Sequence, residues 1–321
     1  MPKLNMEKEG RGALYFGIFV FVLVVLILST ASAGFFDFFK AKITGKATSS
    51  PVTLNITIGA TNTPNVTYVG NDSMTNISIG PNEGPTSTPV KINITAYDED
   101  GIADLNVSSL NVSFSRSGEA VRFNSTCANS VNFSTYYANF TCNITMYWYD
   151  GAGAWDINAS ISDNGGRLNF TSSQNFQVGS TDGFVMAPTA LTWASLSPGD
   201  TNKQAVENIT TNNTGNVNKL IEINATSLRG ESNAGIGLWA GNFTVNNTVS
   251  TPCLGTALYN NYTFANITAT TLPKGNFTID DKTTGQEQTT FCLTTVGSEL
   301  TAQSYSTTAN GSWTLRIVTS T

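Results

Sequence analysis

Apolar and polar side chains alternate along most of the chain after about residue 50, in short runs that end at glycine, asparagine or aspartate. Clear examples are Val90 to Ala96, Leu110 to Phe114 and Phe140 to Trp148. Successive side chains of a strand point to opposite faces, so a period of two indicates strands with one buried face. Short strands of this kind, separated by turn residues, predict an antiparallel β-sandwich.

The alternation predicts two domains rather than one. The segment Ser180 to Gly183 interrupts it, and a second set of alternating runs follows. A chain of 321 residues is long enough to bury two cores. We therefore expect an all-β protein with tandem antiparallel β-sandwiches, the first over residues 51–180 and the second over residues 184–321.

Inward positions follow from the same parity. In the first domain they include Val121, Phe123, Cys127, Cys142, Trp148, Trp155, Leu168 and Phe170. In the second they are Leu191, Trp193, Ile221, Ile223, Phe243, Val245, Ala265, Ile267, Phe277, Ile279, Trp313, Leu315 and Ile317. Tyr147 and Tyr149 have the opposite parity, so we expect them to face outward as a candidate interface pair.

The N-terminus has the features of an export signal. Residues 1–12 carry three basic side chains, an apolar run follows from Ala13 to Leu28, and Ala31-Ser32-Ala33 resembles a signal-peptidase site. We favour cleavage after Ala33 over a retained membrane anchor. A third alternative is cleavage after Gly12, as in type IV prepilins. Residues 34–50 then form a tether, and its aromatic start extends the predicted membrane contact over residues 13–39.

Acceptor sites for N-linked glycans are unusually dense. Asn-x-Ser/Thr occurs twenty-two times, and x is never proline. The sequons that we select as glycosylation sites have Val, Ile or Phe at x; they begin at Asn55, Asn65, Asn76, Asn93, Asn111, Asn139, Asn143, Asn242, Asn266 and Asn276. Chance in an Asn/Thr-rich chain explains some sequons, but it explains poorly why x is so often apolar. Alternation predicts Asn and Thr outside with x in the core.

Composition and charge exclude several classes of function. The chain has no histidine, which removes serine and cysteine triads as well as histidine-ligated zinc. Phosphate-binding loops, nucleophile elbows and dinucleotide fingerprints are also missing from the sequence. The isoelectric point near 4.7 argues against nucleic-acid binding. We expect a protein that is not an enzyme.

Four cysteines allow three pairings. Separate cores favour pairing within each domain, Cys127 with Cys142 and Cys253 with Cys292. No two cysteines have C-x-x-C spacing, so a metal site made of thiolates is a weak alternative. Disulfides and sequons agree on an oxidising, extracellular location at the cell surface.

One loop gathers carboxylates, in the pattern Asp98-x-Asp100-Gly101-x-x-Asp104. Calcium binds several oxygens at once, and loop carboxylates supply them. The alternative is a β-turn whose aspartates bond their own backbone. Calcium at Asp98, Asp100 and Asp104 is the single cofactor that the sequence suggests.

Two segments resemble known families. Thr95 to Asp104 with Met146 to Trp155 resembles immunoglobulin-like repeats of archaeal secreted surface proteins. Leu191 to Asp200 with Asn212 to Asn216 resembles immunoglobulin-like envelope domains, including camelysin-type fibre proteins. The resemblance implies an immunoglobulin-like fold and a surface role, and it brings no catalytic residues. It also implies that an N-terminal strand can be lent to the next subunit.

The alternating segment Val52, Leu54, Ile56 and Ile58 has the pattern of such a donated strand, although for a single sequence we favour the first strand of its own domain. The favoured function is therefore a glycosylated envelope or filament subunit whose partner is itself. The alternatives are a monomeric adhesin or other binding module and, remotely, a carboxylate hydrolase.

Overall fold

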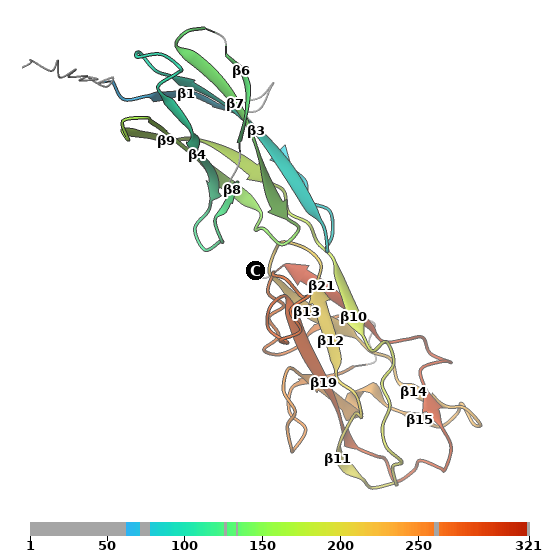
Figure 1. Ribbon diagram of the computed structural model, residues 1–321. Helices are drawn as coiled ribbons and strands as arrows, with labels where there is room; N and C mark the ends of the chain where they lie inside the picture. The colour runs from blue at the N-terminus through green and yellow to red at the C-terminus, as the bar shows by residue number, and fades with distance from the viewer. Residues whose placement is uncertain (1–61, 71–77, 125–126, 133, 260–262, 320–321) are drawn as a thin grey trace, which may run out of the picture. The chain divides into compact units, whose positions relative to one another are not determined.

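The computed structural model describes residues 62–70, 78–124, 127–132, 134–259 and 263–319 (Figure 1). All of them belong to one compact unit, Gly59–Thr321. The predictions made for residues 1–58 lie outside the described residues; they are the export signal, the tether, the strand Val52–Ile58 and the sequon at Asn55. The sequon at Asn76 also lies outside them.

The described part of the chain is all-β. Its strands form several sheets, and apart from a single 3-10 turn, Ala240–Asn242, it holds no helical segment. No helix in these ranges is long and apolar enough to cross a membrane. The all-β prediction is confirmed at this level.

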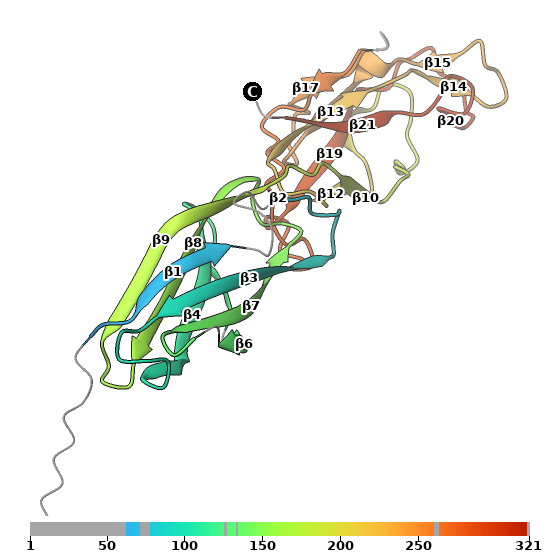
Figure 2. The same cartoon turned by 90° about the horizontal axis from the view of Figure 1, so that it is seen from above.

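Residues 62–178 form two sheets, which we call the N-terminal sheet pair (Figures 1 and 2). The first sheet is antiparallel in the order β1 (Asn65–Gly70), β3 (Ser87–Tyr97), β7 (Tyr137–Tyr147) and β6 (Cys127–Asn132). The second has the order β2 (Ser78–Ile79), β9 (Leu168–Val178), β8 (Gly153–Asp163), β4 (Leu105–Ser115) and β5 (Arg122–Asn124). In the second sheet β2 runs parallel to β9, and the other neighbours are antiparallel.

One hydrophobic core joins the inner faces of these two sheets. Alternate residues of β3 and β7 are buried, and they pack with alternate residues of β4 and β8. Trp155 is the largest fully buried side chain, and its indole N–H donates to the Gly151 carbonyl oxygen at 2.9 Å. A buried polar N–H requires such a partner, which explains how the core accommodates a tryptophan.

The prediction that Leu168 and Phe170 point inward is wrong, because a register shift reverses the faces of β9. Between Ile157 and Ala159 of β8, the partner strand β9 advances by one extra residue. Phe176 and Val178 keep the core face, while Leu168 and Phe170 are 60% and 74% exposed. A bulge of this kind exchanges the inward and outward faces along the rest of the strand.

Val121 and Phe123 are exposed as well, against prediction. Phe123 lies opposite Ser113 on β4, while the core residues Val112 and Phe114 face Asn124 and Arg122. Residues directly opposite each other in neighbouring strands share a face of the sheet. The register of β5 against β4 therefore places Phe123 on the face of Ser113, away from the face of Val112 and Phe114.

Residues 184–319 form the C-terminal sheets. The largest has the order β10 (Phe184–Ala187), β12 (Ile209–Asn213), β19 (Gln286–Thr295), β16 (Phe243–Asn246) and β17 (Thr256–Ala257), with β11 (Thr201–Gln204) also paired to β19. A second consists of β18 (Ala265–Asn266), β13 (Lys219–Asn224) and β21 (Thr314–Thr319). The third consists of β15 (Gly237–Leu238), β14 (Leu228–Gly230) and β20 (Tyr305–Ser306).

The C-terminal sheets have their own core, separate from the first. Phe243 lies at its centre, with Trp193 and Trp313 packed edge-on against it. Two predictions fail here. Leu191 and Trp193 pack on the core, but residues 188–200 contain no strand. Ile279 is 54% exposed in a turn, because residues 276–279 form a hydrogen-bonded turn instead of continuing a strand.

Candidate functional site

Most of the sequons selected from the sequence place the x residue in a core. Outside that selection, Ala159, Ile209 and Ala225 are also buried x residues, whereas Val107 and Phe170 are exposed. Among the selected sequons, the buried x residues are Val66, Ile94, Val112, Phe140, Ile144, Phe243 and Ile267. The sequon asparagines before them are exposed at Asn65, Asn111, Asn143 and Asn266 and half-buried at Asn93, Asn139 and Asn242. Six of these seven sequons place the asparagine on the outer side of a strand. The exception is the sequon at Asn242, whose asparagine belongs to the 3-10 turn and whose Thr244 is buried.

Two sequons of the first sheet face each other. In the antiparallel register of β3 and β7, Asn93 lies opposite Thr141 and Thr95 lies opposite Asn139. The Thr141 hydroxyl donates to Asn93 Oδ1 at 3.0 Å, and the Thr95 hydroxyl donates to Asn139 Oδ1 at 2.7 Å. The outer face of the sheet is thus held by reciprocal bonds between the two acceptor motifs.

Both predicted disulfides are present, Cys127–Cys142 and Cys253–Cys292, and no described cysteine is free. The first joins residues that lie directly opposite each other in β6 and β7, with Cα atoms 4.4 Å apart. Val121 and Phe123, which the alternation grouped with Cys127 as inward, are exposed. The predicted pairing is therefore right, although that grouping is wrong.

The carboxylate loop connects β3 to β4 at one end of the N-terminal sheet pair. Asp98 follows the last residue of β3, and its backbone N–H donates to the Tyr136 carbonyl oxygen at 2.9 Å. The turn is closed by the Gly101 N–H on the Asp98 carbonyl oxygen and by the Asp104 N–H on the Gly101 carbonyl oxygen. Gly101 has a φ of 102°, which an L side chain rarely adopts, so glycine is required in this turn.

The structure brings the three predicted aspartates together. One carboxylate oxygen from each of Asp98, Asp100 and Asp104 lies within 4.8 Å of the other two. Asp98 is fully buried, Asp104 is half-buried and Asp100 is exposed. The cluster therefore extends from the protein interior to the solvent.

Burial raises the pKa of Asp98 above its usual range. A hydrogen bond from the Asp100 backbone N–H opposes this shift, while the negative charges of Asp104, Asp100 and Asp163 add to it. Desolvation and like charge both disfavour a carboxylate anion. Asp98 is thus held in surroundings that penalise its own negative charge.

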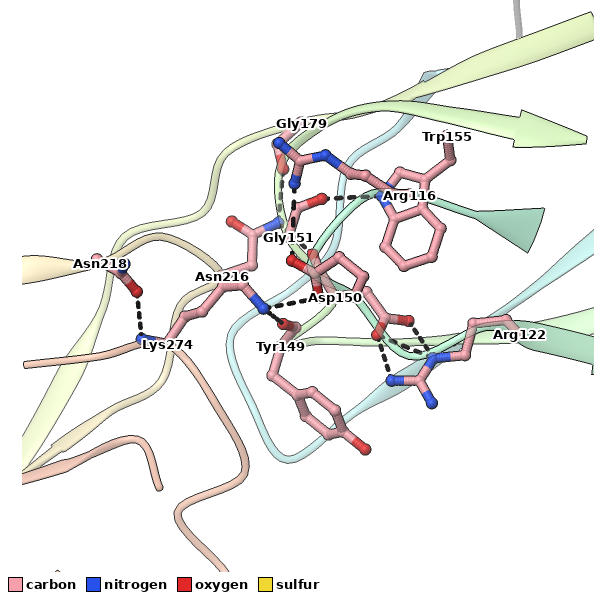
Figure 3. Close-up of polar contacts among 11 residues, drawn as sticks. Arg116, Arg122, Tyr149, Asp150, Gly151, Trp155, Gly179, Asn216, Asn218 and Lys274 are labelled. Carbon is pink, nitrogen blue, oxygen red and sulfur yellow. Dashed lines mark hydrogen bonds and ion pairs between the residues drawn. The ribbon is translucent and has the colours of Figure 1, made fainter. Parts of the chain in front are cut away.

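A second polar cluster surrounds Asp150, which directly follows Tyr149 in the loop after β7. Asp150 is fully buried, and the Arg122 guanidinium binds its carboxylate with Nη2 to Oδ1 at 2.5 Å (Figure 3). Nε of Arg122 donates to both carboxylate oxygens, and the Tyr147 backbone N–H donates to Oδ2 at 2.7 Å. The sequence could not show this pair, because the two residues are far apart along the chain.

Arg122 also orders the tyrosines that were predicted to face outward. Tyr147 and Tyr149 stack with ring centroids 5.4 Å apart and planes inclined by 10°. The guanidinium carbon lies 4.8 Å from the Tyr147 ring centroid and 5.6 Å from that of Tyr149. Tyr147 is 38% exposed, so a cation and two aromatic rings form one patch that is partly open to solvent.

The loop that holds Asp150 also contacts the C-terminal sheets. The Asn216 amide donates to the carbonyl oxygens of Asp150 and Gly179 at 3.0 and 2.8 Å (Figure 3). Nζ of Lys274 binds the Glu119 carboxylate at 2.8 Å and the Tyr149 carbonyl oxygen at 3.3 Å. These bonds fix the loop on which Asp150 and the tyrosines lie.

Trp148 is buried as its parity predicts, but its neighbours were not foreseen. Its ring packs against Phe277 at 5.2 Å and edge-on against Tyr149 at 5.3 Å. Phe277 is the x residue of the sequon at Asn276, so this sequon places its apolar side chain on Trp148 instead of in the C-terminal core.

Comparisons with known proteins give no family for this chain. No protein-family model matches the sequence, and no curated protein is significantly similar to it.

Proposed function

We propose that this chain is a non-enzymatic structural protein of the cell surface, a glycosylated envelope or filament subunit built from two tandem immunoglobulin-like β-sandwiches. The observation that carries the proposal is the placement of the sequons. The x residues of five selected sequons lie in the first core, and those of two lie in the second. The asparagines of these seven sequons are exposed or half-buried. Dense acceptor sites on rigid strands suit a surface covered by sugars.

The disulfides support an extracellular location, because such bonds persist in oxidising compartments. The proposed export signal and the contact of residues 13–39 with a membrane belong to the same account. So does the likeness to archaeal secreted proteins and camelysin-type fibres, which rests on the sequence motifs.

Self-assembly by strand donation is the finer part of the proposal. In strand addition, main-chain hydrogen bonds to a sheet edge supply affinity, and alternate side chains supply specificity. The alternating segment Val52–Ile58 has the pattern of such a strand.

Electron microscopy of two purified forms tests this proposal. One form begins at Gly34, and the other begins at Gly59, which removes Val52–Ile58 but keeps every residue of the compact unit. We expect filaments or sheets from the longer form only. Monodisperse particles from both forms would contradict assembly through the N-terminal segment.

A second candidate, a monomeric adhesin or binding module, is favoured by the patch of Arg122, Tyr147 and Tyr149. Tyr147 is 38% exposed and Tyr149 is half-buried. An accessible aromatic ring beside a cation is suited to stack on sugars and to form an interface anchor. Binding of the protein to a glycan array, lost in a Tyr147→Ala variant, would support this candidate. An array without signal would exclude glycan recognition by the patch.

A further inference from the structure

Two carboxylate oxygens of the β3–β4 loop are buried without a hydrogen-bond donor. They are Oδ2 of Asp98 and Oδ2 of Asp104, and neither accepts a bond from any described residue. Asp98 is fully buried, so water cannot readily replace the missing donor. A buried charged oxygen without a partner costs free energy, and native proteins rarely tolerate it without a compensating ligand.

No basic side chain compensates these oxygens in the described ranges. The ion pairs there include none with Asp98, Asp100 or Asp104. The nearby Arg167 guanidinium is bound to Asp163, at 3.2 Å from its Oδ2. Within the part of the chain that the structure describes, the loop therefore concentrates three carboxyl groups that form no ion pair with a lysine or arginine.

The spacing of the oxygens suits a calcium ion. Calcium–oxygen distances are about 2.3–2.6 Å, so two ligand atoms on opposite sides of one ion are separated by about 4.6–5.2 Å. One carboxylate oxygen from each of Asp98, Asp100 and Asp104 lies within 4.8 Å of the other two, so one oxygen from each residue can share a single ion.

Asp100 is exposed, so one side of the cluster is open to ions and water. Both its oxygens accept bonds from Asn62, from the backbone N–H at 2.8 Å and from the side-chain amide at 3.3 Å. A carboxylate oxygen has two lone pairs, so these bonds hold Asp100 in place and still leave it able to bind a cation.

We propose that Asp98, Asp100 and Asp104 bind one calcium ion, with Oδ2 of Asp98 and Oδ2 of Asp104 as its buried ligands. The ion neutralises the two unpartnered oxygens and ties the β3–β4 loop to the end of the sheet pair. Water and backbone carbonyls complete the coordination. This site is independent of the assembly proposed above, because it depends only on residues of one loop.

Terbium luminescence on the full-length protein tests the site directly. Tyr97 precedes Asp98, and its ring lies 4.8 Å from Tyr137 and 6.4 Å from Tyr136, so tyrosines adjoin the loop and can sensitise a bound lanthanide. We expect tyrosine-excited terbium emission that calcium displaces, with a calcium Kd on the order of 0.1–1 mM, as in extracellular calcium modules. Emission that calcium does not displace would overturn the proposal.

Thermal unfolding supplies a second measurement. Calcium at about 100 times its Kd should raise the melting temperature of the N-terminal sheet pair by roughly 5–10 °C. The Asp104→Asn variant should lose this response. In EDTA it should melt no lower than the wild type, because it removes a charge that is unpartnered and repels Asp98.

Asp156→Asn is the matched control, since it removes an exposed carboxylate from β8 outside the cluster. It should keep both the luminescence and the calcium response. If Asp104→Asn does not fold, Asp98→Asn replaces it in both assays. An unchanged calcium response in the folded variant, or equal stabilisation of the wild type by magnesium, would contradict a calcium site at this loop.

Discussion

The buried pair of Arg122 and Asp150 should contribute more to stability than any exposed ion pair of this protein. The decisive perturbation is Arg122→Leu, which removes the guanidinium and keeps much of the side-chain volume. Asp150 is 0% exposed, and three of the contacts to its carboxylate come from Arg122. The Tyr147 backbone N–H alone would then remain as a donor to that carboxylate.

The magnitude follows from this burial. Removing one partner of a buried ion pair costs about 3–5 kcal/mol, because the other charge stays buried without its counterion. The variant also removes the cation above Tyr147 and Tyr149, which adds roughly 0.5–1 kcal/mol. We expect Arg122→Leu to lower the free energy of unfolding of the N-terminal sheet pair by about 3.5–6 kcal/mol in total.

The assay is urea unfolding followed by circular dichroism, with Asp150→Asn and the double variant completing a cycle. The double variant should be less destabilised than the sum of the single variants, since it leaves no buried charge unpaired. Arg316→Leu is the control: Arg316 pairs with Glu222 but is 51% exposed, so its loss should cost about 1 kcal/mol or less. Equal effects of Arg122→Leu and Arg316→Leu would refute the reasoning.

Three further predictions concern the two disulfides, the dependence of stability on Asp163 at acid pH, and the exposed side chain of Phe170. Replacing Cys253 and Cys292 by alanine should lower the free energy of unfolding by about 4 kcal/mol, because their disulfide closes a loop of 39 residues. Replacing Cys127 and Cys142 should lower it by about 3 kcal/mol, because that loop has 15 residues. Equal or reversed losses of unfolding free energy, measured in urea, would contradict the loop-length argument. Burial alone would raise the pKa of Asp163, but bonds from the Arg167 backbone and side chain outweigh it and lower the pKa. The stability that the ionised Asp163 contributes is complete above about pH 4 and is lost as the pH falls through the lowered pKa. Between about pH 5 and pH 2 the wild type should therefore lose more stability than the Asp163→Asn variant. Parallel curves of stability against pH for the two proteins would exclude this contribution. Phe170→Ser should change the melting temperature by less than about 2 °C, because the ring is 74% exposed; a large loss would place it in a core.

Alternation predicted the strands well wherever the pairing is regular. Ile94, Phe140 and Ile144 are inward as expected, because β3 and β7 pair residue for residue over their full length. It failed at Leu168 and Phe170, because a bulge depends on the partner strand and leaves no mark in the sequence of β9 itself.

The candidate sites were predictable only where the residues are close in sequence. Asp98, Asp100 and Asp104 belong to one turn, so their spacing was enough to place them together. The bond between Arg122 and Asp150 depends on how β5 meets the loop after β7, which no local pattern encodes. Phe277 was predicted to lie in the core of the second domain, but its ring packs against Trp148. No local sequence pattern encodes this contact either, because the two residues are far apart along the chain.

The account rests on sugars attached to the outer faces of the strands. The most direct test is glycopeptide mass spectrometry of the mature protein isolated from its native cell surface. We predict glycans at the exposed acceptors Asn65, Asn111, Asn143 and Asn266. Occupancy should be lower at Asn93, Asn139 and Asn242, whose side chains are half-buried and hydrogen-bonded within the sheets. A mature protein without glycans at any of these positions would contradict the central claim.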